Sequence, residues 1–252
     1  MRVIEAGARV YRRTWRGSVI STFLNPILYL LAMGVGLGEL VDEGSGGASL
    51  DLPYLTFLAP GLLAAAAMQT GAGDASYPVM AGIKWRKTYQ AVLSTPVGIR
   101  ELLIGHLGWV GIRLTFVATV FSMIMVLFDA TTVTEGLAAI PPAVLTGLAF
   151  AAIVTAYTAR LKNETGLASM FRFAIVPMFL FSGTFFPIEQ LPSFMQPLAY
   201  VTPLWHGVEL CRGFALGIDF TVHPLVSIAY LVGWMVVGAI LAIRILRRRL
   251  IA

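Results

Sequence analysis

Residues 102–128 read LLIGHLGWVGIRLTFVATVFSMIMVLF, and Arg113 is the only charged residue among them. A helix needs about 20 consecutive apolar residues to cross roughly 30 Å of hydrocarbon. This run exceeds that length. It therefore predicts a transmembrane helix, and five further stretches of the chain pass the same test.

The composition of the whole chain also points to a membrane protein. Hydrophobic residues make up 58% of the 252 residues and charged residues 12%, whereas a soluble domain has about 45–50% and about 25%. Mean hydropathy is +0.81. These values exclude disorder, a collagen-like repeat and a secreted disulfide scaffold. The single cysteine, Cys211, cannot form an internal disulfide, and with three histidines it leaves almost no ligands for zinc.

We predict an all-α polytopic membrane protein in which residues 1–252 form one transmembrane domain with six helices. The expected spans are residues 18–38, 54–80, 102–128, 136–157, 167–186 and 222–245. A cleaved signal peptide is the competing interpretation of the N-terminus. The first apolar run is longer than an h-region of about 7–15 residues, and no A-x-A-type cleavage site follows it.

Lysine and arginine are divided very unequally between the two sides that these spans define. Sixteen of the eighteen fall in the two termini and the loops after the second and fourth spans. The other side has only Arg212, together with nine acidic residues. Positive residues mark the cytoplasmic side of a membrane protein, so both termini are expected to be cytoplasmic.

The first 16 residues fit a helix that lies on the membrane surface. Ile4, Ala8, Tyr11 and Trp15 share one helical face, and the arginines fall on the opposite face. The alternative is a basic flank of the first span that forms no helix of its own.

The loop between the second and third spans combines cations with aromatic side chains. It contains Lys84, Trp85, Arg86, Lys87 and Tyr89. Tryptophan, tyrosine and arginine often dominate protein–protein contacts, but aromatic residues beside cations also form interfacial belts. The residues alone leave both interpretations open. Nucleic-acid binding is disfavoured, because the cations are spread over four cytoplasmic segments.

The segment from residue 187 to 221 is long and apolar, but it is interrupted by prolines. A broken chain exposed to lipid would leave backbone groups without hydrogen bonds. We therefore expect short re-entrant helices before the last span. Their charged residues should turn towards water or each other: Glu189, Glu209 and Arg212.

Two charged residues lie inside the expected spans. Asp74 is 10 residues before Lys84, and Arg113 is 13 residues after Arg100, so their depths are similar. Ionisable groups inside a membrane are costly and are usually paired or functional. We predict an intramembrane ion pair between Asp74 and Arg113, with snorkelling of Arg113 to the interface as the alternative.

No arrangement of residues indicates catalysis, a cofactor site or a metal site. The histidines, at positions 106, 206 and 223, have no serine, cysteine or carboxylate at a recurring spacing. A phosphate-binding loop of the form G-x-x-x-x-G-K-[ST] does not occur. Any nucleotide chemistry is therefore expected in another chain.

Three stretches resemble a known family. They are YLTFLAPG at residues 54–61, FSGTFFPIEQLP at 181–192 and PLWHGVELCRG at 203–213. Together with six spans and this length, they resemble permease subunits of type-2 ATP-binding-cassette exporters. The most similar subgroup contains nodulation-factor and daunorubicin-type export permeases.

The resemblance implies a permease homodimer or heterodimer in a prokaryotic plasma membrane, bound to two cytoplasmic ATPase subunits that hold ATP and Mg. It assigns the role of coupling helix to residues 82–96, and so places Lys84, Trp85, Arg86, Lys87 and Tyr89 at the ATPase interface. A hydrophobic drug or lipid-like substrate is expected, with lipid-linked oligosaccharide or polysaccharide as the alternative.

The strongest rival class is a stand-alone secondary transporter or channel. The missing inverted repeat and the scarcity of charges in the spans disfavour it.

Overall fold

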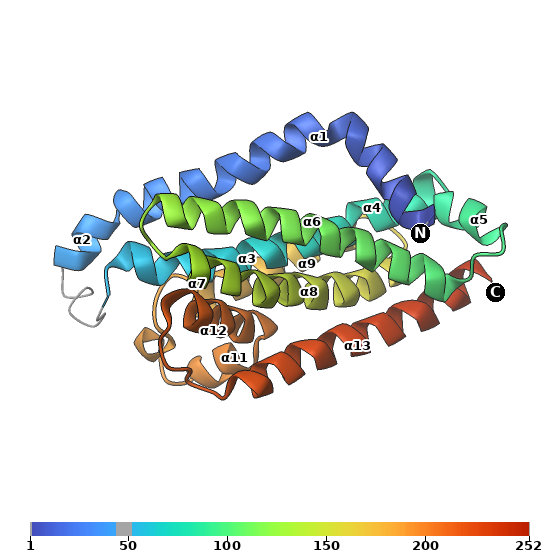
Figure 1. Cartoon of the computed structure of the whole chain (residues 1–252). Helices are drawn as coiled ribbons and strands as arrows, with labels where there is room; N and C mark the ends of the chain where they lie inside the picture. The colour runs from blue at the N-terminus through green and yellow to red at the C-terminus, as the bar shows by residue number, and fades with distance from the viewer. Residues whose placement is uncertain (1, 44–51, 252) are drawn as a thin grey trace.

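The computed structural model describes residues 2–43 and 52–251 (Figure 1). All regular elements in these two ranges are helices, so the predicted all-α class is confirmed. In chain order they are α1 Arg2–Tyr29, η1 Leu30–Val35, α2 Gly38–Glu43, α3 Tyr54–Ala75, α4 Tyr77–Met80, η3 Ala81–Trp85, α5 Thr88–Leu93, α6 Ile99–Leu127, α7 Val133–Ala138, α8 Ile140–Arg160, α9 Thr165–Met170, η4 Phe171–Ile175, α10 Val176–Phe181, η5 Ile188–Gln190, α11 Gln196–Val201, α12 Pro203–Leu216 and α13 Pro224–Leu250. The elements η1, η3 and η4 are π-helical turns, and η5 is a 3₁₀ turn.

Five helical stretches of the described chain are long and apolar enough to cross a membrane. They are Trp15–Glu43, Tyr54–Trp85, Ile99–Leu127, Val133–Arg160 and Pro224–Leu250. The remaining expected span, residues 167–186, corresponds to a shorter apolar helix, Thr165–Phe181. This helix ends early because Gly183 adopts the left-handed conformation, with φ of 77°. Six membrane crossings therefore stay a prediction.

Hydrogen bonds attach both ends of the short helix to neighbouring segments. At one end, the Tyr157 hydroxyl near the end of α8 donates to the Gly166 carbonyl, 3.1 Å away. At the other end, the Thr202 hydroxyl lies 2.8 Å from that of Ser182. Figure 1 shows both chain termini and α5 at one end of the molecule, and α2, α7 and α11 at the opposite end.

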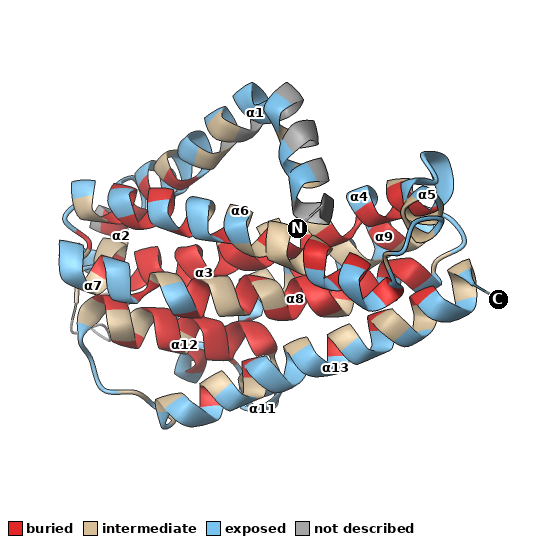
Figure 2. Ribbon diagram, turned by 45° about the vertical axis from the view of Figure 1, so that its right-hand side comes forward, coloured by how far each residue is buried: buried red, intermediate tan, exposed pale blue. Residues whose placement is uncertain are grey.

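Helix α3 lies at the centre of the bundle. Of the most apolar part of the stretch Tyr54–Trp85, 72% is buried, compared with 18% for Trp15–Glu43 and 22% for α13. Small residues allow the central helices to approach closely: a Cβ atom on Gly71 would clash with the Gly147 carbonyl of α8. In Figure 2 the buried residues gather on α3, α8 and α12, whereas α1 and α13 are largely exposed. The outer helices thus present apolar surface suited to lipid.

The interfacial helix and first span form one helix rather than two elements. Helix α1 starts at Arg2 and continues past position 17 without interruption, because no proline occurs before Pro26. It bends sharply, and its N-terminal arm returns towards α6 (Figure 1). There Tyr11 packs edge-on against Trp109, with ring centroids 5.8 Å apart. Its place at the membrane surface stays a prediction.

Candidate coupling segment and membrane cavity

The second long helix breaks between α3 and α4. Pro78 lies in the first turn of α4 and has no N–H to donate to the preceding turn. The Ser76 hydroxyl donates to the Gly73 carbonyl at 2.9 Å, and the buried Thr158 hydroxyl of α8 donates to the Ala75 carbonyl at 2.9 Å. The Gly73 carbonyl also accepts from the Ser76 amide, so the Ala75 carbonyl is the one that depends on a side chain from another helix.

Beyond the break, the chain turns back on itself. Lys87 adopts a left-handed conformation with φ of 51°, which ends the stretch containing η3 and starts α5. The Gln90 side-chain amide donates to the Ile83 carbonyl at 2.9 Å. A Cβ atom on Gly82 would lie only 2.7 Å from the Tyr89 ring, so a glycine is required there. Residues 82–96, the coupling segment, thus form a compact hairpin of short helices.

The five residues expected at an ATPase interface do not all face the same way. Lys84, Trp85, Arg86 and Lys87 are exposed, and the side chain of Trp85 is 49% exposed. Tyr89 instead packs towards the bundle, in a cluster with the buried Val79, Ile83 and Ile99. Burial raises the pKa of its phenol. The outward face of the segment therefore consists of three cations around one tryptophan.

A cleft of about 570 Å³ lies beside this hairpin. It separates the end of α5 from the C-terminal end of α13 and is lined by Gln90, Leu93, Ser94, Thr95, Pro96, Val97, Gly98, Leu250 and Ile251. Backbone carbonyls hold its threonine and serine hydroxyls, as in the 2.6 Å hydrogen bond from Thr95 to Val92. The coupling segment therefore has a concave surface at the cleft and a protruding side chain at Trp85.

Asp74 and Arg113 lie in direct contact. The Arg113 guanidinium donates from Nη1 to Asp74 Oδ1, and the two side chains are 25% and 15% exposed, respectively. The same guanidinium lies 5.5 Å from the centre of the Tyr11 ring. The structure therefore brings the two predicted residues together and links α3, just before its break, to α6 and to the arm of α1.

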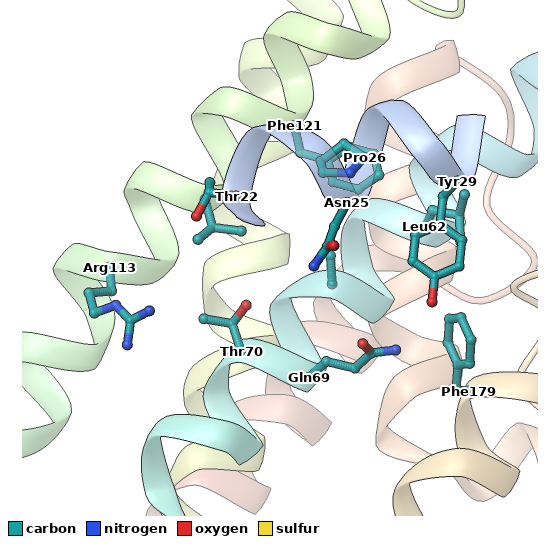
Figure 3. A pocket seen from close by; sticks show the side chains of 12 residues that line it. Thr22, Asn25, Pro26, Tyr29, Leu62, Gln69, Thr70, Arg113, Phe121 and Phe179 are labelled. Carbon is teal, nitrogen blue, oxygen red and sulfur yellow. The ribbon is translucent and has the colours of Figure 1, made fainter. Parts of the chain in front are cut away.

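Next to this ion pair is a cavity of about 270 Å³ among the long helices (Figure 3). Its walls come from four helices and mix polar with apolar side chains: Thr22, Asn25, Pro26, Tyr29, Leu62, Ala66, Gln69, Thr70, Arg113, Val117, Phe121 and Phe179. Figure 3 shows Arg113 at one side of the cavity and Asn25, Gln69 and Thr70 around its middle.

Of these residues, only Arg113 is predicted from the sequence to be functional. The available signal was uncharged polar residues within apolar runs: Asn25 before Pro26, and the adjacent Gln69 and Thr70.

At the opposite end, the three stretches that carry the family resemblance meet at Arg212. Its Nε atom donates to the Phe57 carbonyl at 3.3 Å, and its Nη2 atom donates to the Gly183 carbonyl at 2.9 Å. Its guanidinium carbon is 3.8 Å from the centre of the Phe57 ring. We call this contact the Arg212 junction.

Arg212 shares a pocket with Glu189 and Glu209, in line with the expectation that these charges turn towards water or each other, and the junction adds main-chain partners that the sequence did not indicate. Its guanidinium donates to the Gly183 carbonyl, which is free of a helix where Gly183 interrupts the chain, and to the Phe57 carbonyl in the first turn of α3. Glu189 instead accepts from the Tyr200 hydroxyl at 3.3 Å, and Glu209 accepts from the Thr221 amide. Both acids line a small pocket with Arg212.

His206 and His223 have structural partners. The buried His206 has Nδ1 3.0 Å from the Ser227 hydroxyl. His223 caps α13 by accepting from the Leu225 amide at 3.3 Å. These contacts explain both residues without chemistry.

Comparison with known proteins identifies the family to which this chain belongs. The family described as ABC-2 type transporter matches residues 3–216. The chain belongs to this family. Nodulation protein J of Rhizobium meliloti (strain 1021) is 30% identical over 240 residues, which cover 95% of this chain and 89% of the relative. Nodulation protein J of Rhizobium leguminosarum bv. trifolii is 29% identical, covering 96% and 93%.

A more distant relative is the inner membrane transport permease YadH of Escherichia coli (strain K12). It is 22% identical, covering 86% of this chain and 82% of the relative. The predicted resemblance is confirmed. The permease is a membrane component of an ABC transporter, and membership of the family implies an ATP-binding partner.

Proposed function

We propose that the permease moves a hydrophobic drug or lipid-like molecule outward, from the cytoplasm or the inner leaflet. The observation that carries this proposal is continuity: the same stretch, Tyr54–Trp85, lines the cavity and leads into the exposed coupling segment. A movement of the coupling segment can therefore be transmitted to the cavity through this one stretch of helix.

The transporter we propose contains two permease chains and two cytoplasmic ATPases. ATP and Mg bind to the ATPases, and this chain supplies no nucleotide chemistry. If the two permease chains are identical, a closed two-fold dimer is the simplest arrangement for them. The exposed residues of the coupling segment, Lys84, Trp85, Arg86 and Lys87, contact the ATPase, while Tyr89 holds the segment in shape.

Six crossings and cytoplasmic termini complete the proposal. Thr165–Phe181 crosses as the shortest span, since a helix of about 17 residues is at the lower limit for a bilayer. The shared position of the two termini supports this count (Figure 1). The coupling segment lies at their end, and α11 and α12 are re-entrant from the outer side.

ATP-driven closure of the ATPases pulls or tilts the coupling segment. The motion passes through η3 and α4 to the break at Ser76 and then to the ion pair, which couples α3 to α6 and α1. These helices line the cavity, so its access changes from inward to outward. Two packed arrangements of the same helices are sufficient for such a switch.

A second substrate class has one observation in its favour. Asn25, Gln69 and Thr70 give the cavity hydrogen-bonding groups that a purely apolar drug does not need. Lipid-linked oligosaccharide or polysaccharide would use them. A stand-alone secondary transporter or channel has less support, because the family is one of ATP-dependent transporters.

The proposal is tested by reconstitution with an ATPase encoded in an adjacent reading frame. Vesicles with both chains should expel a fluorescent lipid analogue or hydrophobic dye only when ATP is present. Gln69→Leu should reduce export, whereas Thr119→Leu on the exposed side of α6 should not. Export without ATP or without the ATPase would contradict the proposal, and export of lipid-linked sugar alone would select the second substrate class.

Orientation has its own test in intact cells. The native Cys211 is fully buried, so it should not react with maleimide, and labelling will report only on the engineered cysteines. Thr134→Cys, at the outer end, should react with an impermeant maleimide, and Thr88→Cys in the coupling segment should react only after lysis. The reverse pattern would overturn the orientation.

A further inference from the structure

A second hollow, distinct from the cavity, opens on the side of the bundle. It measures about 520 Å³ and lies between α8, the stretch Thr165–Phe181, the start of α12 and α13. Phe150, Phe173, Met178 and Trp234 are among its walls. Apart from the indole of Trp234, only Tyr157 and Ser169 bring polar side-chain atoms to it. We call it the lateral groove, and its volume falls within the range of about 300–1,000 Å³ typical of ligand sites.

Cations gather where the lateral groove approaches the end of α8. The Arg249 guanidinium donates to the Ala159 carbonyl at 2.6 Å, and the Lys84 ammonium donates to the Lys162 carbonyl at 3.1 Å. Arg160 and Lys162 are themselves exposed in the same turn. Glu164 is the one acid in this connection. This end of the groove therefore carries a net positive charge, two helical turns or less from the Tyr157 wall.

We infer that the lateral groove binds one acyl chain of an anionic phospholipid from the cytoplasmic leaflet, with the headgroup held by Arg160, Lys162 and their neighbouring cations. Two independent features support this occupant: an apolar trough open on the side of the bundle, and a basic cluster at one end of it. Basic pockets between helices on the cytoplasmic side are a recurrent way to hold anionic headgroups.

A second copy of the permease is a poorer occupant. A two-fold contact centred on the groove would place the same patch of both copies face to face. The cations of one copy would then meet those of the other, which opposes association. An anionic lipid removes this repulsion and fills the groove.

The bound lipid has a mechanical consequence. Met178 lines the lateral groove, while the next residue, Phe179, lines the transport cavity. Helix α10 is therefore a thin wall between the two spaces. The π-helical turn η4, which supplies Phe173 and Ala174 to the groove, is a distortion of the kind often found at functional sites. An acyl chain in the groove would fix the position of this wall.

The leaflet named here rests on the orientation proposed above, but the test does not. The natural chain is reconstituted into phosphatidylcholine vesicles with a small fraction of lipid brominated on its acyl chain, either phosphatidylglycerol or phosphatidylcholine. Bromine quenches tryptophan fluorescence on contact. The signal of Trp234 is the difference between the natural chain and Trp234→Phe, and it needs neither ATPase nor transport.

We expect the anionic brominated lipid to half-quench Trp234 at a mole fraction about fivefold lower than the zwitterionic one. The variant Arg160→Gln/Lys162→Gln should lose this preference. Ala174→Phe, which fills the groove, should weaken quenching by both lipids, whereas Thr119→Phe on the exposed face of α6 should not.

Equal quenching by the two lipids would overturn the headgroup site. Absence of quenching by either would overturn the lipid occupant and indicate that protein covers the groove. As a second readout, phospholipid that co-purifies with the natural chain in mild detergent should be enriched in anionic headgroups. Failure of that enrichment would contradict the inference even if a tryptophan variant misfolds.

Discussion

Helices α12 and α5 stand at opposite ends of the molecule, and their surroundings differ sharply. Ten of the fourteen residues of α12 are buried, whereas α5 has no buried residue. Arg212 of α12 donates to the main chain of two distant segments, while α5 is attached through Gln90 and the Tyr89 contact. The end with α12 is thus tightly packed, whereas the end with α5 exposes most of its side chains, as the proposed contact with an ATPase requires.

The difference has a direct consequence for mutations. Changes at the Arg212 junction should act on folding, because they leave buried carbonyls without donors. Changes on the exposed face of the coupling segment should act on assembly and leave folding intact. The ion pair lies between the two regions and should affect both.

The largest effect is expected for Arg212→Leu. It removes two charge-assisted hydrogen bonds and the cation–π contact with Phe57, so the free energy of unfolding should fall by about 3–4 kcal/mol. The measurement is the yield of monodisperse protein in detergent and its midpoint of thermal unfolding. Arg212→Lys keeps the charge but not the forked geometry. Its unfolding midpoint should therefore lie between those of the natural chain and Arg212→Leu. A stable Arg212→Leu protein would show that the end containing α12 does not depend on this junction.

A smaller effect is expected for the ion pair. Asp74→Asn and Arg113→Gln should each cost about 2 kcal/mol, because each leaves a partly buried charge without its partner. The double variant should cost less than the two losses added together. Folded yield and ATP-dependent export complete the double-mutant cycle. Strict additivity would mean that the contact contributes no coupling between α3 and α6.

The smallest effect is expected at the helix break. Thr158→Val leaves the Ala75 carbonyl without its donor and should cost about 1 kcal/mol, seen as a fall of about 2–4 °C in the unfolding midpoint. Thr155→Val is the matched control: Thr155 is also buried in α8, but its hydroxyl bonds to Ala151 within its own helix. Equal falls in the unfolding midpoint of the two variants would show that the hydrogen bond from Thr158 to Ala75 contributes no more to stability than the one within α8.

Long-range features of the fold follow well from the sequence. Apolar length and the distribution of lysine and arginine are properties that a bilayer imposes on the chain directly. They predict the helical class and the grouping of both termini with the coupling segment. The pairing of Asp74 and Arg113 follows from the same constraint, because charges of similar depth in adjacent helices have few other partners.

Local geometry was harder to predict. Tyr89 and Trp85 have similar chemical character, and only the left-handed turn at Lys87 decides that Tyr89 faces inward. The bonds from Arg212 to main-chain carbonyls could not be predicted, because those carbonyls belong to segments far away in sequence. The cavity joins residues from four helices, and no short motif brings Asn25, Gln69 and Phe179 together. Such sites depend on packing between helices.

The most direct test of the account compares two exposed tryptophans. Trp85 is 49% exposed on the coupling segment, and Trp15 is 47% exposed on α1. If the coupling segment docks on the ATPase, Trp85→Ala should weaken co-purification of the ATPase by about 30-fold, equivalent to about 2 kcal/mol, while membrane insertion stays normal. Trp15→Ala should leave co-purification unchanged. Equal behaviour of the two variants would contradict the account, since Trp85 would then be only one more aromatic residue at the membrane interface.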